Sequence, residues 1–126
     1  MNKLGLGESA EDYLEAILML KEKNGQVRSI DIADLLEVTK PSVSNAVKRL
    51  REKGYIEMDA SSFITLTDTG YEIARNVYER HQTITDLFVS LGVDREVAQE
   101  DACRIEHILS EQSYKALMTL KDKLDS

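Results

Sequence analysis

Two short amphipathic segments separated by a tight connection constrain the fold of this chain most. Apolar residues recur at helical spacing in residues 29–36 and again in 40–50, with only three residues, 37–39, between the two segments. Ser29 is placed to cap the first of these helices, Pro41 suits the first turn of the second, and Gly54 is placed to end it. Two short helices joined by a three- or four-residue turn predict a helix-turn-helix.

The segments on either side extend this motif. Residues 55–58 and 63–66 have the composition of two short β-strands, and the polar residues 59–62 make the turn between them. Such a hairpin directly after a helix-turn-helix predicts a wing. Before the motif, Ser9 is placed to cap a first helix, which Gly25 ends.

The chain after the hairpin reads as helix only. We expect a long helix after residues 67–70, an apolar stretch over 84–91, a helix capped by Asp94 that carries 102–109, and a last amphipathic helix over 113–124. The predicted fold class is therefore mainly α: a winged helix-turn-helix domain over residues 1–72, followed by an all-helical domain over 73–126. The last helix most simply forms a dimer seam, although it could also pack on its own subunit.

Charge is distributed unevenly along the chain. The formal net charge is −7, which by itself argues against nucleic acid as a partner. Residues 38–54 nevertheless hold five basic side chains and one acidic, a local charge of +4, so the rest of the chain carries −11. A basic island in an acidic chain is typical of one element that meets phosphate, although a solvated helix face gives the same pattern.

The outward positions of the second short helix predict its contacts with DNA. Small hydroxyl and amide side chains near its N-terminus suit base edges, and the basic residues further along suit phosphates. A capping role for Thr39 and Ser42 is the simpler alternative for those two residues. The candidate DNA-binding residues are Arg28, Thr39, Lys40, Pro41, Ser42, Ser44, Asn45, Lys48, Arg49 and Arg51.

Several classes of protein are disfavoured by the composition. No apolar run reaches the ~20 residues of a membrane span, and the N-terminus does not have the pattern of an export signal. The single cysteine, Cys103, rules out an internal disulfide and fits a reducing compartment. We therefore expect a cytoplasmic protein with no membrane partner.

Two clusters of polar residues predict a metal site. Asp12 and Glu15 are three residues apart on the first helix, so their carboxylates share one side. Cys103, Glu106 and His107 have the spacing that places a thiolate, a carboxylate and an imidazole on one helical face. A divalent transition metal takes this mixture of ligands. A buried small cysteine and a surface carboxylate–imidazole pair are the alternative explanation.

Three segments resemble the diphtheria-toxin-repressor family, which contains iron-dependent repressors and manganese transport regulators. They are Glu11 to Glu15, Lys40 to Ser44, and Asp101 to His107, and they span most of the chain in the family's order. The resemblance implies a winged-helix domain, a helical dimerisation domain, and repression of metal-uptake genes by a homodimer that binds double-stranded operator DNA. The short chain resembles the compact manganese regulators.

The resemblance also implies a set of metal ligands. Asp12 is similar to the manganese branch and Cys103 to the iron branch, so Mn²⁺ and Fe²⁺ are both expected cofactors, with Zn²⁺ as a surrogate. Thr85 and Gln99 stand where the iron branch has ligands of a second site. The implied ligands are Asp12, Glu15, His81, Cys103, Glu106 and His107.

The expected function is therefore a metal-activated repressor in which the metal joins the two domains. Two other classes remain open from the residues alone. One is a winged-helix regulator without metal that senses a small molecule or a partner protein, and the other is a metalloenzyme. Nothing in the sequence indicates a general base beside a substrate cleft, so we expect no enzymatic activity and no small-molecule substrate.

Overall fold

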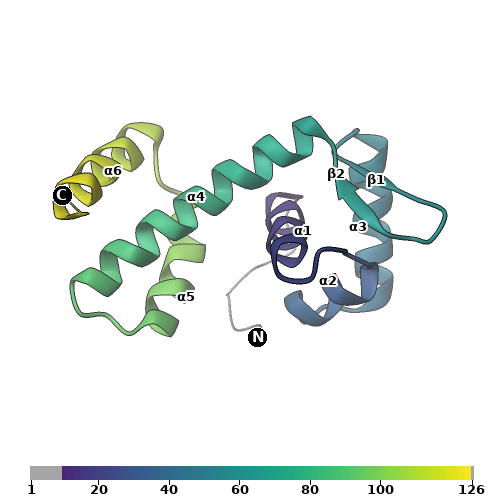
Figure 1. The fold of residues 1–126 in the computed structure, drawn as a ribbon, viewed down its shortest axis with the longest axis horizontal. Coiled ribbons are helices and arrows are strands. Elements are labelled where there is room, and N and C mark those ends of the chain that lie inside the picture. Colours follow the sequence, from purple (N-terminus) through teal and green to yellow (C-terminus); the bar gives the residue numbers. More distant parts are fainter. Residues whose placement is uncertain (1–9, 126) are drawn as a thin grey trace. The chain divides into compact units, whose positions relative to one another are not determined.

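The computed structural model describes residues 10–125. It confirms the mainly helical class and the two-stranded wing (Figure 1). Its contacts divide the described chain into a first unit, residues 10–76, and a second unit, residues 77–125. The boundary expected between residues 72 and 73 stays a prediction, and the expected cap Ser9 lies outside the described residues. The elements are α1 (Ala10–Asn24), α2 (Ser29–Leu36), α3 (Lys40–Glu52), β1 (Ile56–Met58), β2 (Ile64–Leu66), α4 (Asp68–Ser90), α5 (Arg95–Ile105) and α6 (Glu111–Asp125).

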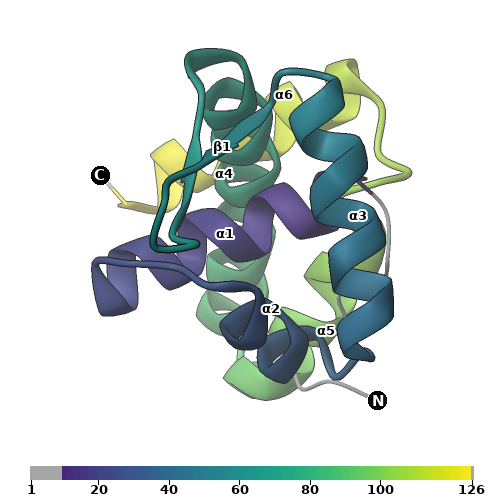
Figure 2. The same ribbon diagram turned by 90° about the vertical axis from the view of Figure 1, so that its right-hand side faces the viewer.

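The first unit has a core built by its three helices and its wing. α1 contacts α2, α3 and β2, and α3 also contacts β1. The apolar faces predicted from helical spacing are the buried ones, and Leu14, Ile17, Ile32, Val43 and Ile64 are almost fully inaccessible. Figure 2 looks onto this unit and shows α2 and α3 joined by the short connection. The predicted helix-turn-helix is therefore present.

The ends of α2 differ in one detail from the prediction. Ser29 was expected to cap α2, but the N-cap position is occupied by Arg28, whose backbone N–H donates to Asp31 Oδ2 at 2.9 Å. The prediction was wrong because the Asp31 side chain, from within the helix, accepts from the Arg28 N–H. Ser29 is therefore the first residue of α2 and not its cap. At the other end, Glu37 adopts a left-handed conformation with φ 55° and ends α2.

The ends of α3 follow the sequence signals. Thr39 occupies the N-cap, and its Oγ1 accepts from the backbone N–H of Ser42 at 3.3 Å. Pro41 lies in the first turn, where its missing N–H breaks no hydrogen bond. Gly54, with φ 78°, turns the chain from α3 toward the wing, in a conformation that glycine adopts without strain.

The wing is an antiparallel pair in which Glu57 lies opposite Thr65. Its turn is built by Asp59, whose Oδ1 accepts from the backbone N–H groups of Ser61 at 2.9 Å and Phe63 at 3.0 Å. Ile64 N–H also donates to the carbonyl of Val27 at 2.7 Å, so the wing is tied to the segment before α2.

α4 is a single helix of 23 residues and belongs to both units. It contains residues 84–90 of the apolar stretch over 84–91, which was expected to be a separate segment. Thr67 precedes it, and Thr67 Oγ1 accepts from the backbone N–H of Gly70 at 3.1 Å. Gly70 lies against the wing so closely that a Cβ there would be 1.9 Å from the carbonyl oxygen of Tyr55.

The second unit contains the remaining turns of α4 together with α5 and α6. Its buried apolar residues include Ile84, Leu87, Ala98 and Ala102. Among residues 10–125 no helix has the length and apolar character needed to cross a membrane. α5 begins after Asp94, whose side chain makes no capping hydrogen bond, and it ends at Ile105, earlier than expected.

Candidate functional site

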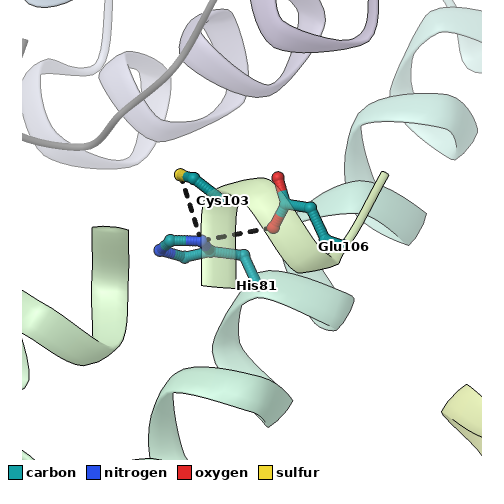
Figure 3. A group of neighbouring side chains, drawn as sticks. All are labelled: His81, Cys103 and Glu106. Atoms are coloured by element: carbon teal, nitrogen blue, oxygen red, sulfur yellow. Dashed lines mark hydrogen bonds and ion pairs between the residues drawn. The ribbon is translucent and has the colours of Figure 1, made fainter. Parts of the chain in front are cut away.

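Three polar side chains that are distant in sequence converge inside the second unit (Figure 3). His81 lies on α4, Cys103 lies on α5, and Glu106 is the residue directly after α5. His81 Nδ1 lies 3.5 Å from Cys103 Sγ and 3.2 Å from Glu106 Oε2. All three residues are buried, with 4%, 3% and 3% of their surfaces exposed.

The donor atoms of these three residues have the spacing of ligands around one ion. Ligands 2.0–2.3 Å from a tetrahedral Zn²⁺ lie roughly 3.3–3.8 Å from one another. The measured separations of 3.5 Å and 3.2 Å are close to this range, and one donor atom of each residue lies within 4.8 Å of the other two. Imidazole, thiolate and carboxylate are also the ligand types that a divalent transition metal takes. The residues therefore fit a metal ion.

Glu106 is the centre of this arrangement. Its second carboxylate oxygen, Oε1, lies 3.4 Å from His107 Nε2, so the carboxylate is flanked by two imidazoles. The Glu106 side chain is fully inaccessible, whereas 27% of the His107 side chain is exposed. Burying a carboxylate is costly unless positive charge or hydrogen bonds compensate it. This site can supply both, from the histidines and from a bound cation.

The expected helical face for Cys103, Glu106 and His107 is present only in part. α5 ends at Ile105, Glu106 is its C-cap residue, and His107 lies in the following turn. His107 therefore leaves the helix, and the prediction that all three side chains project from one helix was wrong.

Asp12 and Glu15 belong to α1 in the first unit. Their exposed fractions are 5% and 0%, although charged side chains of this kind are almost never buried without compensation. Two buried carboxylates on neighbouring turns of one helix are unusual for a structural role alone. Their contribution to a metal site stays a prediction.

The surface of α3 carries most of the predicted DNA contacts. Its inward positions are buried, and Ser44, Asn45, Lys48 and Arg49 are exposed on the opposite side. Thr39, Lys40, Pro41 and Arg51 are exposed as well, and Ser42 is half-buried because it takes part in the cap with Thr39. The arrangement leaves the basic side chains available to phosphate, as a recognition helix requires.

Arg28 lies beside the wing. Its guanidinium carbon is 4.4 Å from the centre of the Phe63 ring, which is cation–π distance. The sequence did not indicate this contact, because Phe63 is 35 positions away and its ring gives no periodic signal. Arg28 remains exposed, so the ring contacts the guanidinium without hiding its charge from solvent.

Arg80 is a second residue that the sequence did not single out. It precedes His81 on α4, and its guanidinium donates to the carbonyl oxygens of Glu106 and Leu109. No local spacing connects residues that are 26 and 29 positions apart, so only the tertiary structure reveals these contacts.

Comparison with protein families finds two matches that together cover nearly the whole chain. Residues 5–62 match the iron-dependent repressor N-terminal DNA-binding domain. Residues 67–126 match the iron-dependent repressor metal-binding and dimerisation domain. The two matches occur in the order expected from the winged helix-turn-helix and the helical second unit.

Individual relatives agree with this match. An uncharacterized HTH-type transcriptional regulator of Methanocaldococcus jannaschii is 37% identical over 120 residues, which are 94% of this chain and 96% of the relative. The transcriptional regulator MntR of Escherichia coli O6:H1 is 36% identical over 116 residues, 92% of this chain and 75% of the relative. Among solved structures, that of the manganese regulator SloR is 28% identical with a TM-score of 0.76, covering 90% of this chain and 54% of the other. The chain thus spans about half the length of SloR and of two other solved structures it matches.

Proposed function

Because the chain belongs to the iron-dependent repressor family, we propose that it represses genes for metal uptake in response to Mn²⁺ or Fe²⁺. It is a metal-dependent transcriptional regulator and not an enzyme, with a DNA-binding domain and a metal-binding and dimerisation domain. In our proposal a homodimer binds operator DNA through α3 when the metal site is filled.

The convergence of His81, Cys103 and Glu106 carries this proposal. An imidazole, a thiol and a carboxylate from separate places in the sequence meet at ligand spacing in a buried place. A regulator without metal has no need for this donor set. The manganese regulator SloR, to which the chain is similar, supports Mn²⁺ as one candidate.

Each ligand has a distinct role in the proposal. When bound, the metal supplies positive charge that offsets the buried carboxylates. His81, Cys103 and Glu106 hold the ion in the second unit, and His107 adds a fourth donor from the turn after α5. Cys103 favours softer ions, because a thiolate is a softer ligand than a carboxylate.

We further propose that Asp12 and Glu15 bind the same ion from the first unit and so join the two domains. The reason is energetic, since both carboxylates are buried on α1, where a cation would stabilise their negative charge. If the ion is absent, Asp12, Glu15 and Glu106 repel one another, and the domains lose a fixed orientation. In a dimer this orientation sets the spacing of two recognition helices, which must match half-sites about 34 Å apart or a multiple of it.

The metal can favour DNA binding only by its differential affinity for the DNA-competent form. Such coupling amounts to ~1–3 kcal/mol in typical cases, or about 5- to 150-fold in affinity. The exposed side chains Lys48 and Arg49 would supply phosphate contacts in either state, so metal should change the fit to two half-sites more than the attraction to DNA.

The test is a fluorescence-anisotropy titration with DNA fragments from metal-transport promoters of the source genome. It is run with chelator and then, under anaerobic conditions, with Mn²⁺, Fe²⁺ or Zn²⁺. We expect tight binding only with metal, and its loss in a Cys103→Ser, Glu106→Gln double variant. Glu100→Gln, an exposed change on α5, is the matched control and should respond like the wild type. DNA binding that is equally tight with chelator would refute the proposal.

A further inference from the structure

Arg80 makes four separate interactions with the segment that follows α5. Its Nη1 donates to the carbonyl oxygen of Glu106 at 3.2 Å and to that of Leu109 at 2.8 Å. Its Nη2 lies 2.8 Å from Glu111 Oε2, in the first turn of α6. The guanidinium carbon also lies 4.8 Å from the centre of the Tyr114 ring. One side chain thus contacts the segment from the end of α5 to the second turn of α6.

The turn after α5 presents carbonyl oxygens to Arg80. Glu106 is the C-cap residue of α5 and Leu109 lies three residues further on, so their carbonyl oxygens are outside the regular hydrogen bonding of this helix. The Arg80 side chain is only 18% exposed, so its donors are directed into the protein. A guanidinium suits this task, because its planar fork presents several N–H donors at fixed angles.

Glu106 is therefore held at two places by neighbouring residues of α4. His81 Nδ1 faces its carboxylate at 3.2 Å, and Arg80 donates to its carbonyl. Successive residues on a helix point about 100° apart, so one α4 turn reaches the side chain and the main chain of Glu106 at once. The two contacts together restrict both the backbone and the side-chain orientation of Glu106.

We propose that Arg80 is a positioning residue of the metal centre. It fixes the main chain of Glu106 so that the carboxylate faces His81 before any ion arrives, and it ties this turn to the start of α6. The inference rests on the proposed metal site and adds a residue that is itself no ligand. Partners that orient metal ligands typically change affinity about 10- to 100-fold when they are removed.

The test variant is Arg80→Lys, studied in the whole 126-residue chain with Co²⁺ as the probe. Lysine keeps the positive charge but offers one compact ammonium, which cannot reach two carbonyl groups and Glu111 with the same geometry. The Cys103 thiolate gives a charge-transfer absorption with Co²⁺, and this band measures occupancy directly. We expect the Co²⁺ affinity to fall about 10- to 100-fold. The matched control is Arg95→Lys, which changes an exposed arginine 3.7 Å from Asp86 and should leave the affinity unchanged.

A metal-free measurement tests the same idea. The backbone N–H groups of Glu106 and Leu109 donate to Ala102 and Ile105 at 2.9 and 3.0 Å. With chelator present, hydrogen exchange at these amides should be faster in Arg80→Lys than in the wild type. Ile84→Val is a core change that lowers stability but keeps Arg80 and its four partners, so it separates positioning from general destabilisation. It should reduce the melting temperature and leave the Co²⁺ affinity unchanged.

The outcomes distinguish an error in the proposed metal site from an error in the role of Arg80. If wild-type protein gives no Co²⁺ band, or if the band persists in Cys103→Ser, the proposed metal site is wrong. If the wild type binds Co²⁺ through Cys103 and Arg80→Lys binds it equally well, the metal site stands and the role of Arg80 is refuted. An equal loss of affinity in Ile84→Val would also overturn the positioning role.

Discussion

Replacing Glu106 by glutamine separates the proposed metal-binding role of this residue from its contribution to the fold. Glutamine has nearly the same shape, so it can keep the contacts near His81 and His107 at 3.2 and 3.4 Å. It removes the negative charge from a side chain that has no exposed surface. The change therefore weakens the attraction for a cation and relieves the cost of a buried charge.

The size of the effect follows from linkage. A ligand at 100 times its dissociation constant stabilises the folded state by about 2.7 kcal/mol. The loss of a ligating charge should weaken affinity at least as much as the loss of a supporting partner, about 100-fold. The same metal concentration then stabilises the variant by only about 0.4 kcal/mol. For a chain of this length 1 kcal/mol corresponds to roughly 3–5 °C, so metal should raise the melting temperature by roughly 8–13 °C in the wild type and 1–2 °C in the variant.

Differential scanning calorimetry with chelator and with Mn²⁺ at 100 times the wild-type dissociation constant measures both shifts. Without metal, Glu106→Gln should be at least as stable as the wild type, because burying a neutral amide costs less than burying a carboxylate. Glu100→Gln makes the same chemical change at an exposed position of α5 and should behave as the wild type. A metal-induced shift in Glu106→Gln as large as in the wild type would refute the reasoning, as would a large loss of stability without metal.

Four further substitutions test other parts of the molecule. Lys48→Ala and Arg49→Ala should each weaken DNA binding and reduce the slope of log affinity against log salt by about one, with unchanged metal affinity. A salt titration of DNA binding measures this slope, and an unchanged slope would contradict a phosphate contact. Gly70→Ala places a methyl group 1.9 Å from the Tyr55 carbonyl oxygen and should cost about 1–3 kcal/mol in thermal unfolding, so an unchanged melting temperature would contradict the close approach. Thr39→Ala removes the cap of α3 and should lower the free energy of unfolding in urea by about 1 kcal/mol, whereas Thr39→Ser should not.

The first unit could be predicted almost entirely from the sequence, because its signals are local. The cap at Thr39, the proline at Pro41 and the glycine at Gly54 lie within a few residues of the boundaries they set. Burial on the inner faces follows the helical spacing of the apolar residues. The cap predicted at Ser29 was wrong because two nearby polar side chains, Ser29 and Asp31, could each accept a hydrogen bond at the start of α2. Asp31 accepts it, from within the helix.

The second unit was predicted less well, because its decisive contacts are distant in sequence. The sequence could not show that α5 ends at Ile105, since no helix-breaking residue follows. Arg80 lies 26 and 29 positions from the carbonyls it contacts there, a separation that no periodic pattern encodes. The position of His81 in the metal site was implied by the family resemblance alone, and its distance to Cys103 is a tertiary property.

Cys103 and Glu106 lie on one side of the chain, as their spacing predicts, although α5 ends early. The reason is the backbone conformation of Glu106. Glu106 has φ −58° and ψ −28°, and its N–H still donates to the carbonyl of Ala102 at 2.9 Å, so the chain stays helical through this residue. Side chains three positions apart therefore remain on one side, although the helix does not continue. Only His107 is released, and it reaches the opposite oxygen of the same carboxylate. Cys103 and Glu106 need just one helical turn to keep their relative placement, so it is unaffected by the error in the predicted helix end, whereas the placement of His107 is changed.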